Sequence, residues 1–115
     1  MTSILYIGID VHTTNYTLCA YTIEGQRIFG QTSINPSIDE LLKYLATIQG
    51  KFRGKACKLV CGYEAGCLGY ALYHQLTYHK YECVILAPTT MPSTVKEIKT
   101  DKRDAVKIAK CLAYG

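Results

Sequence analysis

The order of hydrophobic and polar positions along this chain predicts strands first and alternating strands and helices afterwards. Residues 4–12 (ILYIGIDVH) form a short apolar run with polar neighbours, which is typical of a central strand buried on both faces. Residues 15–23 are rich in Tyr and Thr, and residues 27–34 alternate apolar with polar side chains, so both are predicted strands. The turns between the three strands are short and polar, which predicts an antiparallel meander.

A helical period replaces the strand pattern after Asn35 and Pro36. Ser37 is a candidate N-cap, and Glu40 follows three residues later as its partner in a capping box. The apolar residues after them keep helical spacing as far as Ile48, so one apolar stripe of this helix should face the core.

The second half of the chain predicts strands and helices in turn. The expected elements are a strand at 56–63 that ends at Glu64, a helix at 67–79, a strand at 81–87 and a helix at 101–113. This order implies parallel strands joined by right-handed crossovers. Residues 89–100 are polar and contain Pro92, so we expect a loop there. The prediction is an α/β domain with a mixed five-stranded sheet, three antiparallel strands followed by parallel ones, and helices on both faces.

Length and composition narrow the class of protein. With 115 residues the chain has room for one domain, and a hydrophobic content of 49% excludes a disordered chain. The apolar runs are too short to span a bilayer, and the N-terminus lacks the pattern of a signal peptide. We therefore expect a cytoplasmic protein. The sequence stops at Gly115 without an ending motif, and we expect it to be truncated.

The six cysteines are distributed more like core residues than like a disulfide scaffold. Cys19, Cys83 and Cys111 lie inside apolar periodic segments, where reduced thiols act as small core side chains. The remaining three lie close together in sequence, at Cys57, Cys61 and Cys67. They form no CxxC pair and no matching pair of histidines follows, which disfavours a zinc site.

Charge becomes informative only through its distribution. The net charge is +4, and the last twenty residues are rich in basic side chains: Lys96, Lys99, Lys102, Arg103, Lys107 and Lys110. Such a run is as often a solvated helix face as a binding surface. The acidic residues within it decide how it is interpreted.

Four acidic residues are the candidate chemistry. A carboxylate near the end of a buried strand, such as Asp10, is costly unless a cation meets it, and Gly8 leaves space for another backbone or a ligand. If the strands ending at Asp10 and Glu64 are neighbours, their carboxylates emerge side by side. Asp101 and Asp104 are three apart on a predicted helix and share a face. Four converging carboxylates would repel unless cations neutralised them, which suits Mg²⁺ and metal-assisted phosphodiester cleavage.

Each of these acids also has an ordinary structural explanation. Asp101 could be a helix N-cap with Asp104 as its third-position partner, and this explanation is the better one for that pair taken alone. Glu64 could be a surface residue that follows a strand. Asp10 is hardest to explain without a cation, because the strand around it is apolar.

The motifs that carry these acids resemble a known family. They are GIDVH at 8–12, YEAG at 63–66 followed by GY at 69–70, AP at 87–88, and KTDKRDA at 99–105 followed by IA at 108–109. This pattern is similar to the DEDD-type insertion-sequence transposases, which include the Piv-type DNA invertases and the bridge-RNA-guided recombinases. The last motif and its spacing from the glutamate are the most specific part.

The resemblance implies an RNase H-like fold of the RuvC type in a prokaryotic, cytoplasmic protein. It assigns Asp10, Glu64, Asp101 and Asp104 as the catalytic, metal-binding tetrad, with Mg²⁺, or alternatively Mn²⁺, as the cofactor. It also implies DNA and a guide RNA as partners, and a homo-oligomer of the full-length protein. Lys99, Lys102 and Arg103 would then bind phosphates without reading base sequence. Family members carry a C-terminal domain with a serine thought to attack DNA; we expect residues 1–115 to hold the catalytic RuvC-like domain alone and to be unable to complete strand exchange.

Two other classes of function stay open at this point. Sugar-kinase and actin-like ATPase halves share the three-stranded meander, but they place a glycine where His12 stands so that backbone amides can approach a phosphate. A catalytically inactive nucleic-acid-binding module is the other alternative. Tyr73 and Tyr78 are predicted to lie at exposed helix positions, where they could stack on bases, although packing is the more common role for either one.

Overall fold

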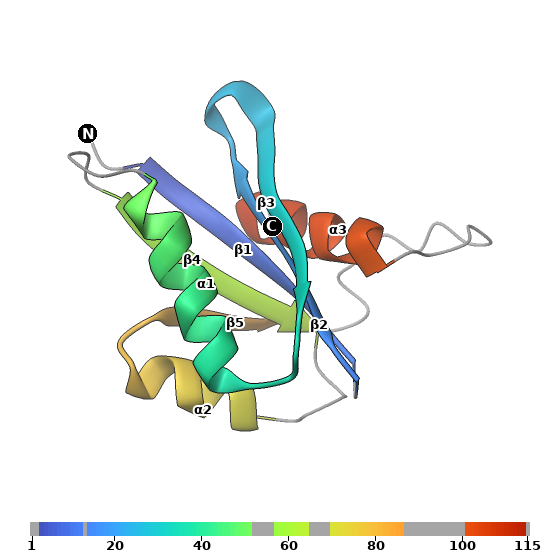
Figure 1. Ribbon diagram of the computed structural model, residues 1–115. Coiled ribbons are helices and arrows are strands. Elements are labelled where there is room, and N and C mark those ends of the chain that lie inside the picture. Colours follow the sequence, from blue (N-terminus) through green and yellow to red (C-terminus); the bar gives the residue numbers. More distant parts are fainter. Residues whose placement is uncertain (1–2, 13, 52–56, 65–69, 87–100, 115) are drawn as a thin grey trace.

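The computed structural model describes residues 3–12, 14–51, 57–64, 70–86 and 101–114, except for the side chains of Ser3, Cys57 and residues 101–104. A five-stranded sheet in the order β3-β2-β1-β4-β5 forms its centre (Figure 1). The strands are β1 (Ser3–Val11), β2 (Tyr16–Thr22), β3 (Arg27–Ile34), β4 (Cys57–Glu64) and β5 (Glu82–Leu86). β1 is antiparallel to β2 and parallel to β4, as predicted for a mixed sheet.

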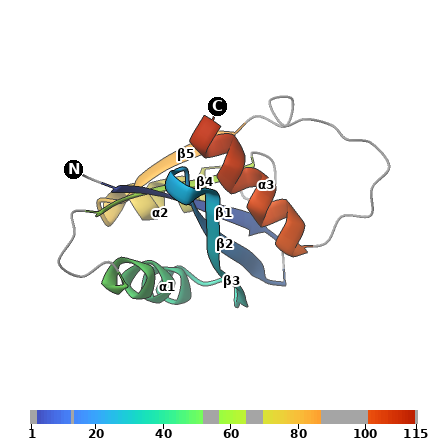
Figure 2. The same cartoon turned by 90° about the horizontal axis from the view of Figure 1, so that it is seen from above.

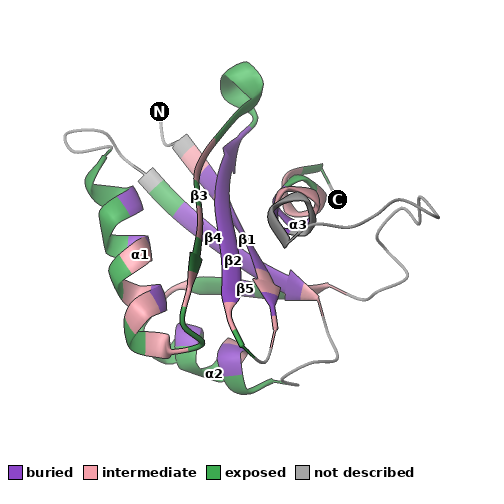
Figure 3. Cartoon of the chain, turned by 45° about the vertical axis from the view of Figure 1, so that its right-hand side comes forward, coloured by how far each residue is buried: buried purple, intermediate pink, exposed green. Residues whose placement is uncertain are grey.

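β1 is the central strand, and its two faces meet different layers. Leu5, Ile7 and Ile9 are fully buried in the larger core, which they share with leucines of the first two helices. The alternate positions, including Gly8 and Asp10, point to the other face because side chains alternate along a strand. Figure 3 shows buried residues along β1 and β2 between the two layers. The prediction of a strand buried on both faces is therefore confirmed.

The turns of the meander and the first helix also agree with the sequence pattern. His12 N donates to Asn15 O at the β1–β2 turn, and a short 3-10 turn, η1 (Glu24–Gln26), joins β2 to β3. Helix α1 (Ile38–Gly50) begins after Ser37, whose Oγ accepts from Glu40 N at 3.4 Å. Only that half of the expected capping box is present, because Ser37 N donates to Asn35 O instead.

The second helix is shorter in the described part of the chain than the pattern predicts. Helix α2 (Ala71–Tyr78) follows Tyr70 and ends at a C-cap, His79, whereas the predicted residues 67–69 lie outside the described residues. Leu72 and Leu76 are buried in the larger core beside leucines of α1. α1 and α2 therefore cover the same face of the sheet.

The last helix, α3 (Asp101–Tyr114), covers the opposite face (Figures 2 and 3). Ala105 and Ala109 are fully buried in a second, smaller core with Cys19 and Tyr21 of β2. The predicted loop at 89–100 lies outside the described residues. The prediction of helices on both faces is confirmed, and the apolar stripe of α3 is the part that packs on the sheet.

Cysteines in the described part of the chain behave as core residues. Cys19, Cys61 and Cys83 are buried and free, and Cys111 is half-buried and free. The side chains of Cys57 and Cys67 are not among those that the structure describes. No helix in the described part of the chain has the length and apolar character needed to cross a membrane.

Candidate active site

Asp10 lies near the end of β1 with its side chain only 13% exposed. The ring of His12, two residues later, is 39% exposed, and its Nε2 lies 3.0 Å from Asp10 Oδ2. A carboxylate can only accept, so the His12 Nε2–H donates to it. This contact holds one carboxylate oxygen of Asp10 in a defined orientation.

Glu64 ends the neighbouring strand beside Asp10. β1 and β4 are parallel and pair Gly8 with Gly62 and Ile9 with Tyr63, so the next step along both strands brings Asp10 and Glu64 to adjacent positions, about 4.8 Å apart in the sheet. Both follow their glycine by two residues and therefore share a face with it. The expectation that these two strands are neighbours is confirmed.

Two close approaches identify that face as the one under α3. A Cβ built on Gly8 would lie 2.7 Å from Ala109 N and would also collide with Ala105 O. A Cβ on Gly62 would run into the Leu112 side chain. The helix backbone thus rests directly on β1, as the small residue at position 8 had suggested, and the two carboxylates lie on the same side of the sheet as α3.

The direction of α3 brings its first turn toward the two carboxylates. Ala105 and Ala109 contact Gly8, while the hydroxyl of Tyr114, at the end of the helix, hydrogen-bonds to that of Tyr21. Tyr21 pairs with Tyr6, which precedes Gly8 on β1. The helix therefore runs backwards along β1, and its beginning is at the Asp10 end of the strand.

The pKa of Cys111 on α3 also responds to a residue of β4. Burial raises the pKa of the Cys111 thiol; the Lys107 ammonium opposes that rise and the Glu64 carboxylate adds to it. Lys107 is half-buried on the same helix. An ammonium group of α3 and a carboxylate of β4 thus act on one thiol.

Neutral hydroxyl groups extend the row of carboxylates across the sheet. Asp10 pairs with Thr17 and Thr17 with Ser33, and Thr17 is only 1% exposed. Asn15 Nδ2 donates to Ser33 Oγ at 2.7 Å and to Thr17 Oγ1 at 3.3 Å. The sequence analysis did not single out these residues, because only the register between strands reveals them as neighbours of Asp10.

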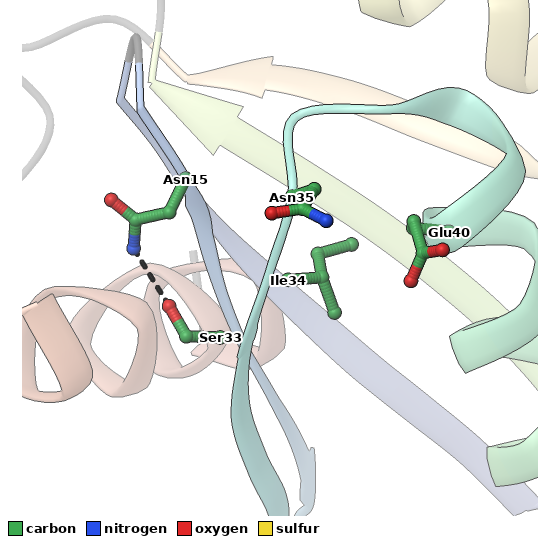
Figure 4. A pocket seen from close by; sticks show the side chains of 5 residues that line it. All are labelled: Asn15, Ser33, Ile34, Asn35 and Glu40. Carbon is green, nitrogen blue, oxygen red and sulfur yellow. Dashed lines mark hydrogen bonds between the residues drawn. The ribbon is translucent and has the colours of Figure 1, made fainter.

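A shallow hollow of about 320 Å³ opens beside the end of this row. Its lining consists of Asn15, Ser33, Ile34, Asn35 and Glu40 (Figure 4). Asn15 and Ser33 are joined there by the hydrogen bond described above, and Glu40 comes from the first turn of α1. The hollow is formed at the edge of the sheet by β3 and the start of α1.

The other half of the predicted tetrad is described only as backbone. Asp101 and Asp104 occupy the first turn of α3, where the predicted helix is confirmed, while their side chains, and those of Lys102 and Arg103, are outside the description. Lys99 lies outside the described residues altogether. Among the side chains that are described, His, Cys, Asp and Glu do not come together in a group of three or more.

Comparison with known proteins adds the family to this geometry. The sequence profile of the DEDD transposases of the IS110 type, described as "Transposase", matches residues 7–115. The chain belongs to this transposase family. The transposase for insertion sequence element IS1533 of Leptospira borgpetersenii is 31% identical over 109 residues, which cover 94% of this chain. Those residues make up 30% of that transposase, so the chain spans about a third of its relative's length.

The fold of this transposase-family chain also matches a solved structure. RuvC of T. thermophilus, in a structure titled as a complex with Holliday junction substrate, superimposes with a TM-score of 0.62 over 98% of this chain and 93% of RuvC. The sequence identity is 12%, so the match concerns the fold. The RNase H-like, RuvC-type fold predicted from the sequence is confirmed.

Proposed function

We propose that this chain is the metal-dependent DNA-cleaving domain of a transposase, with Asp10, Glu64, Asp101 and Asp104 as the residues that hold divalent cations. The observation that carries the proposal is the parallel pairing of β1 with β4, which sets Asp10 beside Glu64 on the face under α3. Membership of a transposase family supports DNA as the substrate.

The residues present fit a magnesium site. Asp10 is a mostly buried carboxylate beside a second one, and two such groups repel in the absence of a cation. Carboxylate oxygens are the ligands that Mg²⁺ prefers, and Mn²⁺ accepts the same set. Asp101 and Asp104 belong to the first turn of α3, and that end of the helix lies toward the Asp10 end of β1. When bound, such ions activate the attacking group and stabilise the leaving oxygen of a phosphodiester.

The chain's own residues have separable tasks in this proposal. His12 holds Oδ2 of Asp10 through its Nε2–H, which fixes the orientation of this carboxylate. Lys99, Lys102 and Arg103 bind phosphates and position the strand, without reading its bases. The full-length protein would add a guide RNA and a further copy of itself as partners, and this domain alone would not complete strand exchange.

A thermal titration tests the metal site. We expect Mg²⁺ or Mn²⁺ to raise the melting temperature of the 115-residue chain, because a ligand that binds only the folded state stabilises it. Asp10→Asn should abolish that rise and should stabilise the metal-free protein by about 1 kcal/mol, since it removes repulsion from Glu64. Asp39→Asn, an exposed acid on α1, is the matched control and should keep the rise. An unchanged melting temperature in Mg²⁺ and Mn²⁺ would refute the proposal.

The same titration separates the two alternatives. Stabilisation by ATP in place of the bare cation would support a kinase-like half. Salt-dependent binding to DNA without any effect of the cations would support an inactive nucleic-acid-binding module.

A further inference from the structure

An aromatic stripe runs along the outer face of α2. Tyr70, His74 and Tyr78 are four residues apart and so lie one above another on a helix. They are opposite Leu72 and Leu76, which are buried. Tyr70 is 66% exposed and Tyr78 82% exposed, and His74 between them is exposed as well. The two tyrosines and the histidine between them form a contiguous exposed aromatic patch, and such patches mark interaction surfaces.

We propose that this aromatic stripe, Tyr70–His74–Tyr78, stacks on the bases of single-stranded DNA. The inference rests on the proposed function, because it assumes that the domain acts on DNA. A single strand is present wherever a duplex opens at a cut, and every base offers a flat face to an aromatic ring.

The spacing of the rings favours unpaired bases over a duplex. Successive residues of the stripe are separated by about 6 Å along the helix axis, and the ring centres of Tyr70 and His74 are 6.4 Å apart with a tilt of 50° between their planes. Stacked bases in a duplex are about 3.4 Å apart along each strand. The rings therefore suit bases that have separated from their neighbours, which only a single strand allows.

The charge of the surface is complementary to a nucleic acid. α2 contains no acidic residue, and Lys80 and the imidazole of His79 follow it. His79 is in edge-to-face contact with Tyr78 at 5.2 Å between ring centres. The next acid along the chain, Glu82, is balanced by Lys58, whose Nζ lies 2.9 Å from Glu82 Oε1. A polyanion can thus approach the stripe without meeting an unbalanced carboxylate from α2 or from Glu82.

A second protein surface fits the stripe less well. A stable interface buries about 800 Å² on each partner, more than three side chains of a helix with two turns can supply. Most of the exposed residues around them are polar, including Gln75, Thr77 and Lys80, and lysine is depleted in the centres of protein interfaces. Stacking, in contrast, requires only one ring for each base.

The test measures the affinity of the 115-residue chain for a fluorescent 12-nucleotide single-stranded DNA by anisotropy, with EDTA present so that no cleavage occurs. Each ring removed should weaken binding roughly fivefold or more, so Tyr70→Ala with Tyr78→Ala should weaken it about 25-fold. Tyr70→Phe with Tyr78→Phe should stay within about twofold of the parent, because the rings remain. Gln75→Ala is the control for an exposed side chain on the same helix and should change nothing.

A second measurement needs no variant and is independent of how well the variants fold. The parent chain should bind an oligonucleotide of the same length with abasic sites about 125-fold more weakly than the intact strand, because the bases facing all three rings are missing. Equal affinity for the intact and abasic strands would overturn the proposal. Three results for the double alanine variant would also overturn it. The first is that the variant binds single-stranded DNA as tightly as the parent, and the second is that it loses affinity for RNA but not for DNA. The third is that it differs from the parent only by a change from dimer to monomer in sedimentation.

The outcome is distinguishable from that of the proposed active site. The stripe lies on α2, and the carboxylates lie on the opposite face of the sheet under α3, so the tyrosine-dependent binding and the cation effect are separate measurements. If Mg²⁺ does not raise the melting temperature but DNA affinity still depends on the tyrosines, only the metal site is refuted. If DNA affinity does not depend on the tyrosines but Mg²⁺ raises the melting temperature, only the stacking surface is refuted.

Discussion

Gly8 of β1 and Ala109 of α3 approach so closely that a single added methyl group would not fit between them. A Cβ on Gly8 would lie 2.7 Å from the backbone nitrogen of Ala109, and a helix backbone cannot move aside as a side chain can. This contact fixes how close α3 lies to the sheet. It therefore also sets how far the first turn of α3 is from Asp10, two residues beyond Gly8.

Gly8→Ala should destabilise the protein by about 3 kcal/mol, the upper range for overpacking a core, because α3 must lift from β1. Denaturant unfolding measures the effect. Gly50→Ala is the matched control, since nothing lies within 4 Å of a Cβ at that position and alanine favours the helix by about 0.5–1 kcal/mol. Equal stability of the two variants would show that α3 does not rest on Gly8.

His12→Ala should weaken the binding of Mn²⁺ by about tenfold while leaving the free energy of unfolding within about 1 kcal/mol of the parent. The reason is that a side chain that orients a metal ligand acts on affinity, and the Nε2–Oδ2 contact of 3.0 Å orients Asp10. Isothermal titration with Mn²⁺ gives the affinity. His12→Gln, which keeps a donor, should restore part of it, and an unchanged affinity in His12→Ala would exclude a positioning role.

Stability should fall as the pH rises above about 9. Burial raises the pKa of the Cys19 and Cys83 thiols to about 12 from an ordinary 9.0. Between pH 9 and pH 12 the folded state therefore keeps the thiol proton that the unfolded state releases. The stabilisation is complete below pH 9 and is lost progressively as the pH rises from 9 to 12. Each thiol contributes a slope of about 1.4 kcal/mol per pH unit. Urea unfolding at pH 8 and pH 10 measures it, and Cys19→Ala should make the slope shallower.

Removing the basic residues around the predicted tetrad should weaken DNA binding and its dependence on salt. Lys102→Ala with Arg103→Ala removes two phosphate contacts, which lowers the slope of log affinity against log salt by about 1.4–1.8. Anisotropy over a salt series measures the slope. Lys43→Ala with Lys51→Ala removes the same charge from exposed positions around α1 and should leave the slope nearly unchanged. If both double variants lower the salt slope equally, the effect depends only on net charge and not on the position of the lysines and arginine.

The Tyr73 and Tyr78 positions illustrate how far a local pattern can be trusted. Both are predicted to be exposed, and Tyr78 is, but Tyr73 is half-buried and packs against the larger core. Its backbone N–H donates to the hydroxyl of Tyr63 at 3.2 Å. Tyr70, the N-cap residue of α2, completes the exposed stripe. Which side of α2 faces solvent follows from its docking on the sheet, which helical spacing alone does not specify.

The sequence by itself determined the elements, and it supplied the four acidic residues proposed for the site. Period and turn chemistry predict the meander with its third strand at Arg27–Ile34, the start of α1 at Ser37 and the helix beginning at Asp101, because these depend on residues near each other in the chain. Only the tertiary structure decided that β4 lies beside β1, that Thr17 and Ser33 continue the row from Asp10, and that α3 rests on Gly8. Strand order, register and helix docking depend on contacts between distant segments, and the free energy of those contacts is not encoded in any local pattern.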